Sequence, residues 1–180
     1  MAGNRCEFAL VKERDVLHCR VFKVRHEKWH RTGGHSFERD TIVHGGAVAI
    51  LPFDRQGRVL MLRQFRPAIR EWLLEIPAGT LDDGELPLAC AKRELIEETG
   101  FAARRWKKLG AIFTAPGFCT EKIHIFEARD LKAAYAKKDD DEFIEVLPMS
   151  LASLRRAIRT GKIHDSKTLC ALTLLAIWKT

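Results

Sequence analysis

The sequence contains no long apolar run and only five cysteines. No run approaches the about 18 apolar residues that a bilayer-spanning helix needs. The N-terminus, MAGNRCEFALVKERD, also lacks the apolar centre of a signal peptide. The cysteines are odd in number, widely spaced and without a CxxC pair, which argues against a disulfide framework and a structural zinc site. We therefore expect a soluble, cytoplasmic protein with reduced thiols and no membrane partner.

No internal repeat, low-complexity linker or abrupt change in composition divides the chain. With 180 residues, 46% of them hydrophobic, it is long enough for one well-buried core and too short for two full domains. Its formal net charge of +7 favours anionic partners, a class that includes nucleotides, nucleic acids and acidic membrane surfaces. Charge alone does not choose among these partners.

Alternating apolar and polar residues predict antiparallel strands in the first part of the chain. Residues 5–24 and 35–44 show this alternation, and the first stretch is expected to turn near Glu13–Asp15. Stronger strands are predicted at 45–53 and 58–65, and the letters DRQG between them are typical of a turn.

The remaining sequence predicts more strands and three helices. One helix is expected to begin at Pro87, since proline suits a first helical turn, and to stop at Gly100. The other predicted elements are strands at 109–115 and 122–128 around a Pro116-Gly117 turn, and helices from Ser150 to about Thr160 and from Asp165 or Ser166 toward Trp178. Many strands with few helices predict a mixed α+β fold or an α/β/α sandwich.

The helix that begins at Pro87 carries an acidic cluster. Glu94, Glu97 and Glu98 stand at i, i+3 and i+4, so their carboxylates project from one face within an arc of about 100°. Only Lys92 and Arg93 are nearby to balance them. Clustered carboxylates are ligands for Mg²⁺ or Mn²⁺, and a bound cation would remove the repulsion between them. The alternative from spacing alone is a solvated helix face.

The residues around this cluster match every fixed position of a known signature. These positions are Gly79, Glu85, Arg93, Glu94, Leu95, Glu97, Glu98, Gly100 and Phe101. The stretch resembles the Nudix box. The resemblance implies an α+β protein with the Nudix α/β/α sandwich and a mixed sheet, in which the box forms loop, helix and loop. It also implies hydrolysis of a nucleoside diphosphate linked to a further group.

The same resemblance implies roles for individual residues. Glu94, Glu97 and Glu98 would be metal ligands, together with the backbone carbonyl of Ala78. Glu97 would also be catalytic, with Glu85 and Arg93 as helpers and Arg93 as an internal ion-pair partner of the glutamates. The implied cofactor is Mg²⁺, with Mn²⁺ as the alternative. Divalent ions would also invert the local field, which a pyrophosphate needs in order to approach carboxylates.

Sequence outside the box resembles the ADP-ribose pyrophosphatase and nucleoside diphosphate sugar hydrolase branch of this family. The stretches that carry the resemblance are RQFRP, WLLEIPAG, DDGE and TAPGFCTEKIHIFEA. By that resemblance Arg66 would meet the diphosphate, Glu121 would touch the terminal sugar, and Arg39 would contribute to purine stacking. Trp72 either lines the sugar pocket or fills the core.

In this branch the general base often comes from an acidic loop after the last long hairpin. That loop corresponds here to KKDDDEFIEV, and Glu142 is the predicted base because it precedes the FIEV strand. Asp140, Asp141 and Glu145 are the alternatives within 139–145. A solvated loop without a base is the other interpretation.

The resemblance divides the chain into an N-terminal β extension at 1–43, which would form a homodimer, and a hydrolase domain at 44–180. The implied reaction cleaves ADP-ribose or a similar nucleoside diphosphate sugar into a nucleoside monophosphate and a sugar phosphate. GDP-mannose or broad nucleotide-sugar hydrolysis is the first alternative. A non-catalytic, ligand-sensing Nudix module is the second. Nucleic acid is not expected as a partner, since Lys and Arg are spread along the chain.

Overall fold

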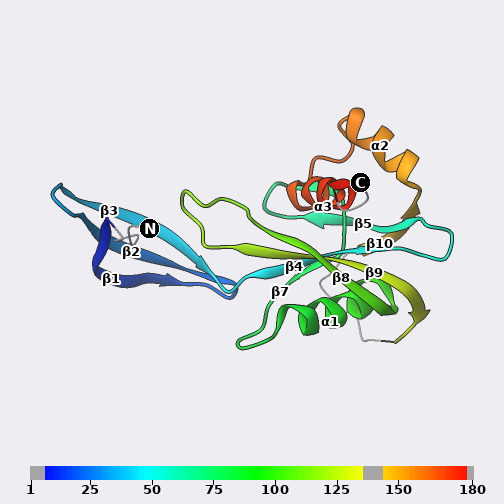
Figure 1. The fold of residues 1–180 in the computed structure, drawn as a ribbon, viewed down its shortest axis with the longest axis horizontal. Helices are drawn as coiled ribbons and strands as arrows, with labels where there is room; N and C mark the ends of the chain where they lie inside the picture. Colours follow the sequence, from blue (N-terminus) through cyan, green and yellow to red (C-terminus); the bar gives the residue numbers. More distant parts are fainter. Residues whose placement is uncertain (1–6, 136–143, 178–180) are drawn as a thin grey trace, which may run out of the picture. The chain divides into compact units, whose positions relative to one another are not determined.

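The computed structural model describes residues 7–135 and 144–177 (Figure 1). The chain forms two compact units. The first consists of Met1–Gly45 with Ala115–Glu121, and the second of Gly46–Thr114 with Lys122–Thr180. Among the described residues, none of the helices is both long and apolar enough to cross a lipid bilayer.

The first unit is built on an antiparallel sheet of three strands in the order β1-β2-β3. Their bounds are Phe8–His18, Phe22–Arg31 and Ser36–His44. The predicted turn near Glu13–Asp15 is wrong, because β1 continues through these residues and the chain reverses after it, where Cys19 N donates to Phe22 O at 2.9 Å. Arg25 on β2 donates to Asp15 at 2.6 Å and to Glu13 at 2.8 Å. These cross-strand ion pairs accommodate the acidic residues that resembled a turn.

The loop around Pro116-Gly117 completes the first unit. The Ile42 amide donates to Phe118 O at 2.7 Å, and the Thr120 amide donates to Ile42 O at 2.9 Å. The predicted turn at Pro116-Gly117 is confirmed. This loop therefore adds a short parallel bridge to the edge of β3.

The second unit contains two sheets. One has the order β7-β4-β9-β8, with β4 and β9 parallel and the other neighbours antiparallel. The other is antiparallel, in the order β10-β5-β6. The bounds are β4 Ala47–Pro52, β5 Val59–Arg66, β6 Glu71–Glu75, β7 Ala78–Thr80, β8 Phe101–Phe113, β9 Lys122–Ala133 and β10 Ile144–Met149. The predicted α+β fold with a mixed sheet and extra N-terminal antiparallel strands is confirmed.

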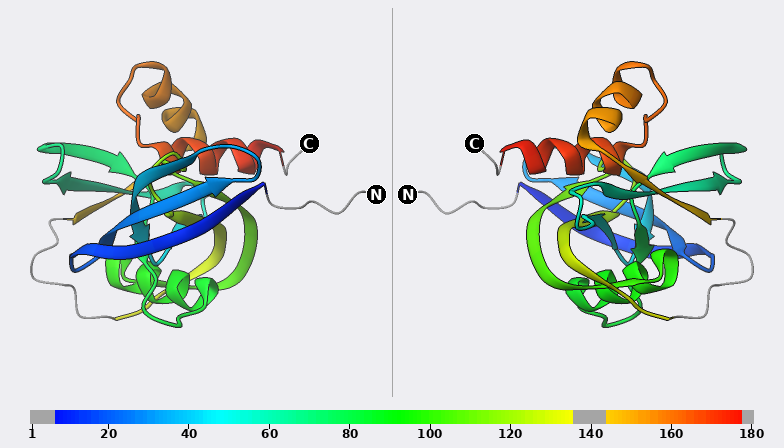
Figure 2. Two further views of the ribbon diagram at one scale, coloured as in Figure 1. Left: turned by 90° about the vertical axis from the view of Figure 1, so that its left-hand side faces the viewer. Right: turned by 90° about the vertical axis from the view of Figure 1, so that its right-hand side faces the viewer.

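Within the described part of the second unit, three helices cover the sheets: α1 Pro87–Thr99, α2 Leu151–Arg159 and α3 Ser166–Ile177. Figure 2 shows α1 on one side of the sheets and α2 with α3 on the other. Alternate residues of β4 pack toward the α1 side and the α3 side of the sheets. Val48 and Ile50 pack with Leu95 of α1, whereas Leu51 packs with Leu175 of α3. This alternation produces two apolar layers on either side of one buried strand.

The helix ends follow the predicted signals. Pro87 opens α1, and Gly100 ends it with a left-handed φ of 73° that a side chain would disfavour. Ser150 caps α2 by accepting a hydrogen bond from the Ser153 amide. Trp178, where the last helix was expected to end, lies outside the described residues. The described cysteines are free: Cys19, Cys90, Cys119 and Cys170.

Candidate active site

The acidic face of α1 lies against β7. The Ala78 amide donates to Glu98 Oε2 at 2.8 Å, so the backbone of β7 and this carboxylate are in direct contact. At Gly79 a Cβ atom would overlap the carboxylate of Glu94. Glycine is therefore required here by the close approach of a side chain and not by an unusual φ angle. Pairing of β7 with β4 fixes the strand at this distance from the helix.

Arg93 lies at the centre of the acidic cluster. Its Nη1 donates to Glu94 Oε1 at 2.6 Å and to Glu97 Oε2 at 3.0 Å, and its Nη2 donates to Glu85 Oε2 at 2.9 Å. The same Nη2 donates to the carbonyl of Thr80 at 3.2 Å. Arg93 is thus an ion-pair partner of these three carboxylates, and the carboxylate of Asp82 lies 3.9 Å from its Nη2. Its guanidinium offsets part of the negative charge of the glutamates on this helix face.

These contacts shift the protonation of their partners. Hydrogen bonds from Arg93 lower the pKa of Glu85 to about 2, against the opposing effect of burial. The pKa of Arg93 is raised by hydrogen bonding to Glu85 and by the neighbouring glutamates. Burial, with the charge of Glu85, raises the pKa of the Cys90 thiol to about 12. Cys90 therefore stays a neutral thiol beside the cluster and is not a nucleophile at neutral pH.

The cluster fits a divalent cation by the chemistry of its donors. Glu94, Glu97 and Glu98 supply hard oxygens beside the Ala78 backbone, which is the ligand type of Mg²⁺. Within the described ranges, no group of three or more His, Cys, Asp or Glu side chains forms a ready-made metal site. Arg93 holds Glu94 and Glu97 at its own Nη1. A cation would have to compete with this guanidinium for both carboxylates.

A second charged group lies beside the box and includes Arg66. Arg66 donates from Nε and Nη2 to the two oxygens of Glu75, at 2.7 and 2.8 Å. Burial alone would lower the pKa of Arg66, but Glu75, Glu98 and Asp165 together raise it. Glu75, the partner of Arg66, ends β6 three residues before Ala78, whose amide donates to Glu98 on the acidic face of α1. Arg66, predicted to meet a diphosphate, is therefore near the cluster.

The partners of Arg66 were missed by reasoning from the sequence. Glu75 is fully buried, and its carboxylate also forms an ion pair with Lys167 on α3. Lys167 further donates to Asp165 at 2.9 Å. The only signal was the presence of charged residues in otherwise apolar stretches. Since Glu75 and Lys167 are separated by 92 positions, no local pattern connects them.

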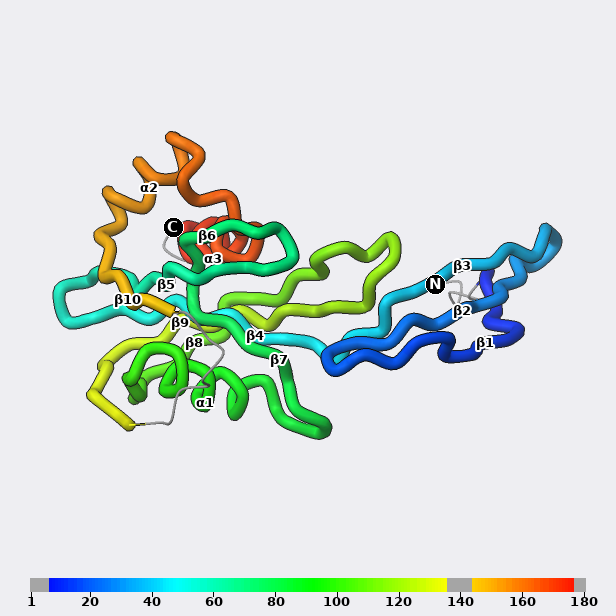
Figure 3. The backbone as a smooth tube through the Cα atoms, turned by 180° about the vertical axis from the view of Figure 1, so that it is seen from behind, coloured from blue at the N-terminus to red at the C-terminus, as the bar shows by residue number. Residues whose placement is uncertain are grey.

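The segment between β6 and β7 is held from both sides. On the α3 side, the Ile76 amide donates to Thr168 Oγ1 at 3.0 Å. On the α1 side, the Ala78 amide donates to Glu98. Between them, the carbonyl of Pro77 accepts from the Ile50 amide at 2.8 Å. Helices on opposite sides of the sheets therefore fix one short segment (Figure 3).

Trp72 does not fill the core, since it is 47% exposed. Its ring lies under the guanidinium of Arg63, 4.4 Å from the centroid, and against Phe65. In the first unit, Arg39 lies over the ring of Phe37 at 4.8 Å. The other predicted substrate residue there, Glu121, lies 3.8 Å from His44 Nε2.

The predicted general base, Glu142, lies outside the described residues, as do Asp140 and Asp141. The remaining alternative, Glu145, is exposed on β10. Its carboxylate lies 3.6 Å from Arg63 Nη1.

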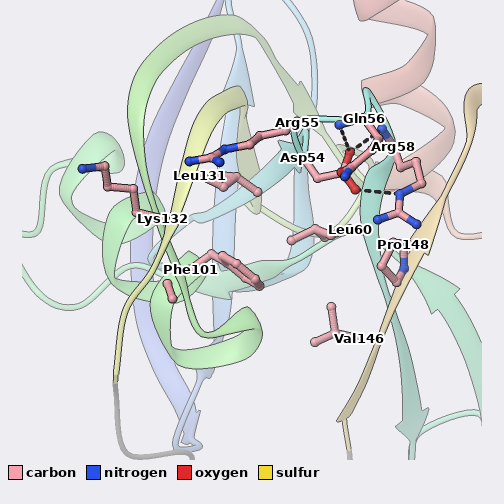
Figure 4. A pocket seen from close by; sticks show the side chains of 11 residues that line it. Asp54, Arg55, Gln56, Arg58, Leu60, Phe101, Leu131, Lys132, Val146 and Pro148 are labelled. Carbon is pink, nitrogen blue, oxygen red and sulfur yellow. Dashed lines mark hydrogen bonds and ion pairs between the residues drawn. The ribbon is translucent and has the colours of Figure 1, made fainter.

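The cavity of about 730 Å³ shown in Figure 4 is lined by none of the predicted site residues that the structure describes. Its apolar walls come from Leu60 and Val146 on one side and from Phe101 and Leu131 on the other. These four residues belong to the α1-side core. Asp54 at its edge is paired with Arg58 at 2.7 Å. The cavity is therefore an opening at the end of an apolar layer, apart from the acidic cluster.

Comparison with known proteins gives consistent matches. A family model described as NUDIX domain matches residues 43–172. The chain is 38% identical over 146 residues to ADP-ribose pyrophosphatase of Bacillus subtilis (strain 168), covering 80% of this chain and 79% of the relative. It is 36% identical over 152 residues to GDP-mannose pyrophosphatase of Cronobacter sakazakii (strain ATCC BAA-894), covering 78% of each.

Two further similarities cover nearly the whole chain. Methanol dehydrogenase activator of Bacillus methanolicus is 33% identical over 177 residues, which are 97% of this chain and 96% of that protein. A crystal structure of an ADP compounds hydrolase superposes with a TM-score of 0.83 at 22% identity, covering 96% of this chain and 94% of the other. The structural similarity concerns the fold.

Proposed function

This chain belongs to the NUDIX family, and on that basis we propose that it is a metal-dependent pyrophosphohydrolase of nucleoside diphosphate sugars. The products are a nucleoside monophosphate and a sugar phosphate. The observation that carries the proposal is the complete acidic cluster on α1, packed against a glycine that leaves room for Glu94. The names of two relatives, an ADP-ribose and a GDP-mannose pyrophosphatase, support this substrate class.

We propose Mg²⁺ as the cofactor, with Mn²⁺ as the alternative. Glu94, Glu97, Glu98 and the carbonyl of Ala78 would hold it. When bound, such a cation offsets the charge of a diphosphate and lowers the pKa of coordinated water.

The protein residues around that site have separable tasks. Arg93 is occupied by Glu85, Glu94 and Glu97, so it orients carboxylates and does not contact the substrate. Arg66 uses Nε and Nη2 on Glu75 and turns its remaining edge to the diphosphate. Holding both partners in place before reaction lowers the entropic part of the barrier.

For the general base we propose Glu142, with Asp140, Asp141 and Glu145 as alternatives. The test is Glu142→Gln, which should lower kcat by about 100-fold or more. Glu7→Gln is the matched control, because Glu7 is an exposed glutamate with no proposed role in the reaction. A kcat within a few-fold of wild type for Glu142→Gln would place the base elsewhere.

Glu121, Arg39 and Trp72 are proposed substrate contacts. Trp72 supports this role by its exposure and by the arginine already stacked on its ring, since aromatic faces accept planar groups. We also propose a homodimer formed through the N-terminal sheet at 1–43. Large apolar residues exposed on β1 support it, among them Val11 and Leu17 at 59% and 53%.

A second candidate function is favoured by the relative named as a methanol dehydrogenase activator, which matches 97% of this chain. In that case the domain would act on another enzyme and serve as a ligand-sensing module without turnover. The acidic cluster is complete, however, and this argues for catalysis. The two functions differ in whether the isolated protein hydrolyses anything.

The deciding experiment is product chromatography of purified protein with Mg²⁺ on ADP-ribose, ADP-glucose, GDP-mannose, UDP-glucose, NADH, diadenosine polyphosphates and an oxidised dGTP. We expect a nucleoside monophosphate and a sugar phosphate from the sugar nucleotides. The activity should be lost in Glu98→Gln and kept in Glu7→Gln, a matched change at an exposed glutamate. Turnover only of the triphosphate or the dinucleotides would contradict the substrate class. No turnover would favour the second candidate.

A further inference from the structure

Lys167 is a buried lysine that has no role in the proposed reaction as described above. It lies in the first turn of α3 and is only 9% exposed. Lysine is almost never buried to this extent unless its charge is paired. Its Nζ forms ion pairs with Glu75 and with Asp165, the latter at 2.9 Å. The ammonium is therefore fixed in place and points to the carboxylate of Glu75.

Glu75 in turn connects Lys167 to Arg66. The side chain of Glu75 is 1% exposed, and its oxygens accept from Nε and Nη2 of Arg66. The side chain of Arg66 is 37% exposed. Among the described residues, its Nη1 has no hydrogen-bond acceptor. In this group Lys167 is therefore buried and paired, whereas Arg66 is partly exposed to solvent.

The charges in this group are balanced only when Lys167 is counted. Arg66 and Lys167 carry two positive charges, and Glu75 and Asp165 carry two negative charges. Without Lys167 one negative charge would be in excess, beside a carboxylate that solvent does not screen. The positive charge of Arg66 would then be fully offset by the carboxylates of Glu75 and Asp165. An anion arriving at Nη1 would meet a group with net negative charge.

We propose that Lys167 is a positioning residue for substrate binding, which shares the charge of buried Glu75 so that Arg66 can present Nη1 to the substrate diphosphate. Lys167 acts through Glu75 and Arg66 and touches no substrate atom. The inference rests on the proposed function, because it takes the diphosphate of a nucleoside diphosphate sugar as the anion. It adds a determinant of substrate affinity from α3, outside the sequence of the box.

The first test is the Lys167→Met variant, whose unbranched side chain is one atom shorter than that of lysine and carries no charge. We expect the KM for ADP-ribose to rise about tenfold while kcat stays within about twofold, because only binding of the anion is weakened. Lys167→Arg should restore KM to within about threefold of wild type. The matched control is Lys162→Met, at an exposed lysine on the connection that leads into α3, which should change neither constant.

The second test separates an indirect from a direct role. In a Glu75→Gln background there is no carboxylate charge to share, so adding Lys167→Met should leave KM unchanged within about twofold. If Lys167 contacted the substrate itself, KM would rise in both backgrounds. That result would overturn the proposal. The double variant also removes both members of the buried pair, so it stays informative if Lys167→Met alone does not fold.

A binding measurement makes the test independent of turnover. The probe is adenosine 5′-(α,β-methylene)diphosphate with Mg²⁺, followed by calorimetry, and its Kd should weaken about tenfold in Lys167→Met. If wild type hydrolyses no sugar nucleotide but Lys167→Met still weakens the Kd of the probe, the proposed function fails and the role of Lys167 stands. An unchanged Kd and KM overturns the role, as does a loss of kcat and thermal stability at constant KM. Absence of any binding by wild type also overturns it.

Discussion

At the scale of single residues, position 79 is the one where the structure most clearly requires glycine. Alanine at this position would bring its Cβ into the carboxylate of Glu94, so that carboxylate would have to leave its place beside Arg93. We expect Gly79→Ala to keep the fold and to lower kcat about 100-fold, because small displacements of catalytic groups have effects of this size. Steady-state kinetics with circular dichroism would measure both.

Gly34→Ala is the matched control for this substitution. Its Cβ would meet only atoms of Arg31, at 3.4 Å or more, which is ordinary contact. Both variants lose a glycine and gain one methyl group, so they share the effect on the unfolded chain. If Gly79→Ala kept the activity of Gly34→Ala, the space beside Glu94 would be irrelevant to catalysis.

Glu85 gives a prediction about pH. Its pKa is lowered from 4.5 to about 2 in the folded protein by Arg93, so the folded state favours the ionised carboxylate. This stabilisation is fully present above the ordinary pKa of 4.5 and is lost as the pH falls toward 2. In EDTA, Glu85→Gln should lower the Tm by about 2–4 °C at pH 7, and the difference should shrink below pH 4.5. An equal difference at pH 3 and pH 7 would contradict this origin, and Glu7→Gln provides the baseline.

The residues of the box were predictable because their spacing is local. Glu94, Glu97 and Glu98 share a helix face by geometry alone, and the structure places Ala78 and Gly79 against that face. Glu75 and Lys167 were not predictable, since their contact depends on how β6 and α3 pack. A buried ion pair between distant positions leaves no periodic signal in the sequence.

At the scale of elements, the two C-terminal helices differ in how their N-termini are held. Asp165 accepts from the Thr168 amide at 2.9 Å and from its hydroxyl at 2.6 Å, and it also pairs with buried Lys167. Ser150 caps α2 at the exposed surface, through Ser153. We expect Ser150→Ala to cost about 1 kcal/mol of unfolding free energy. Asp165→Ala should cost about 2 kcal/mol or more, since it also leaves a buried ammonium short of a partner.

Urea denaturation of both variants would measure these costs. Ser150→Ala serves as the control for loss of a cap alone. Equal costs for the two variants would mean that the ion pair of Lys167 with Asp165 adds nothing to the stability of α3.

The elements themselves were predicted with uneven success. Helix α1 has its bounds where Pro87 and Gly100 indicated, because both signals act within one turn. The turn near Glu13–Asp15 was wrong, because acidic residues are common both in turns and in paired strands with a cationic neighbour. Only the partner, Arg25 on β2, decides between these interpretations.

At the scale of the whole molecule, helices from both sides of the sheets in the second unit contact one short segment, residues 75–78. Helix α1 reaches Ala78 through Glu98, and α3 reaches Ile76 through Thr168 and Glu75 through Lys167. The sheets between the helices keep these contacts on opposite sides. The layer order could be predicted from the family resemblance, but the convergence on 75–78 could not, since it depends on packing across the sheets.

The first unit offers a prediction about assembly. Strand β1 is an edge of its sheet, and its exposed apolar residues are Phe8, Leu10, Val11, Val16 and Leu17. An apolar edge strand favours association with another chain unless it is covered. We expect size-exclusion chromatography with light scattering to give twice the mass of one chain. The double substitution Val11→Lys with Leu17→Lys should shift it to a monomer. Ile69→Lys, at a residue 52% exposed in the second unit, should leave the mass unchanged. A monomeric wild type, or a double variant that stays dimeric, would show that β1 is not the dimer contact.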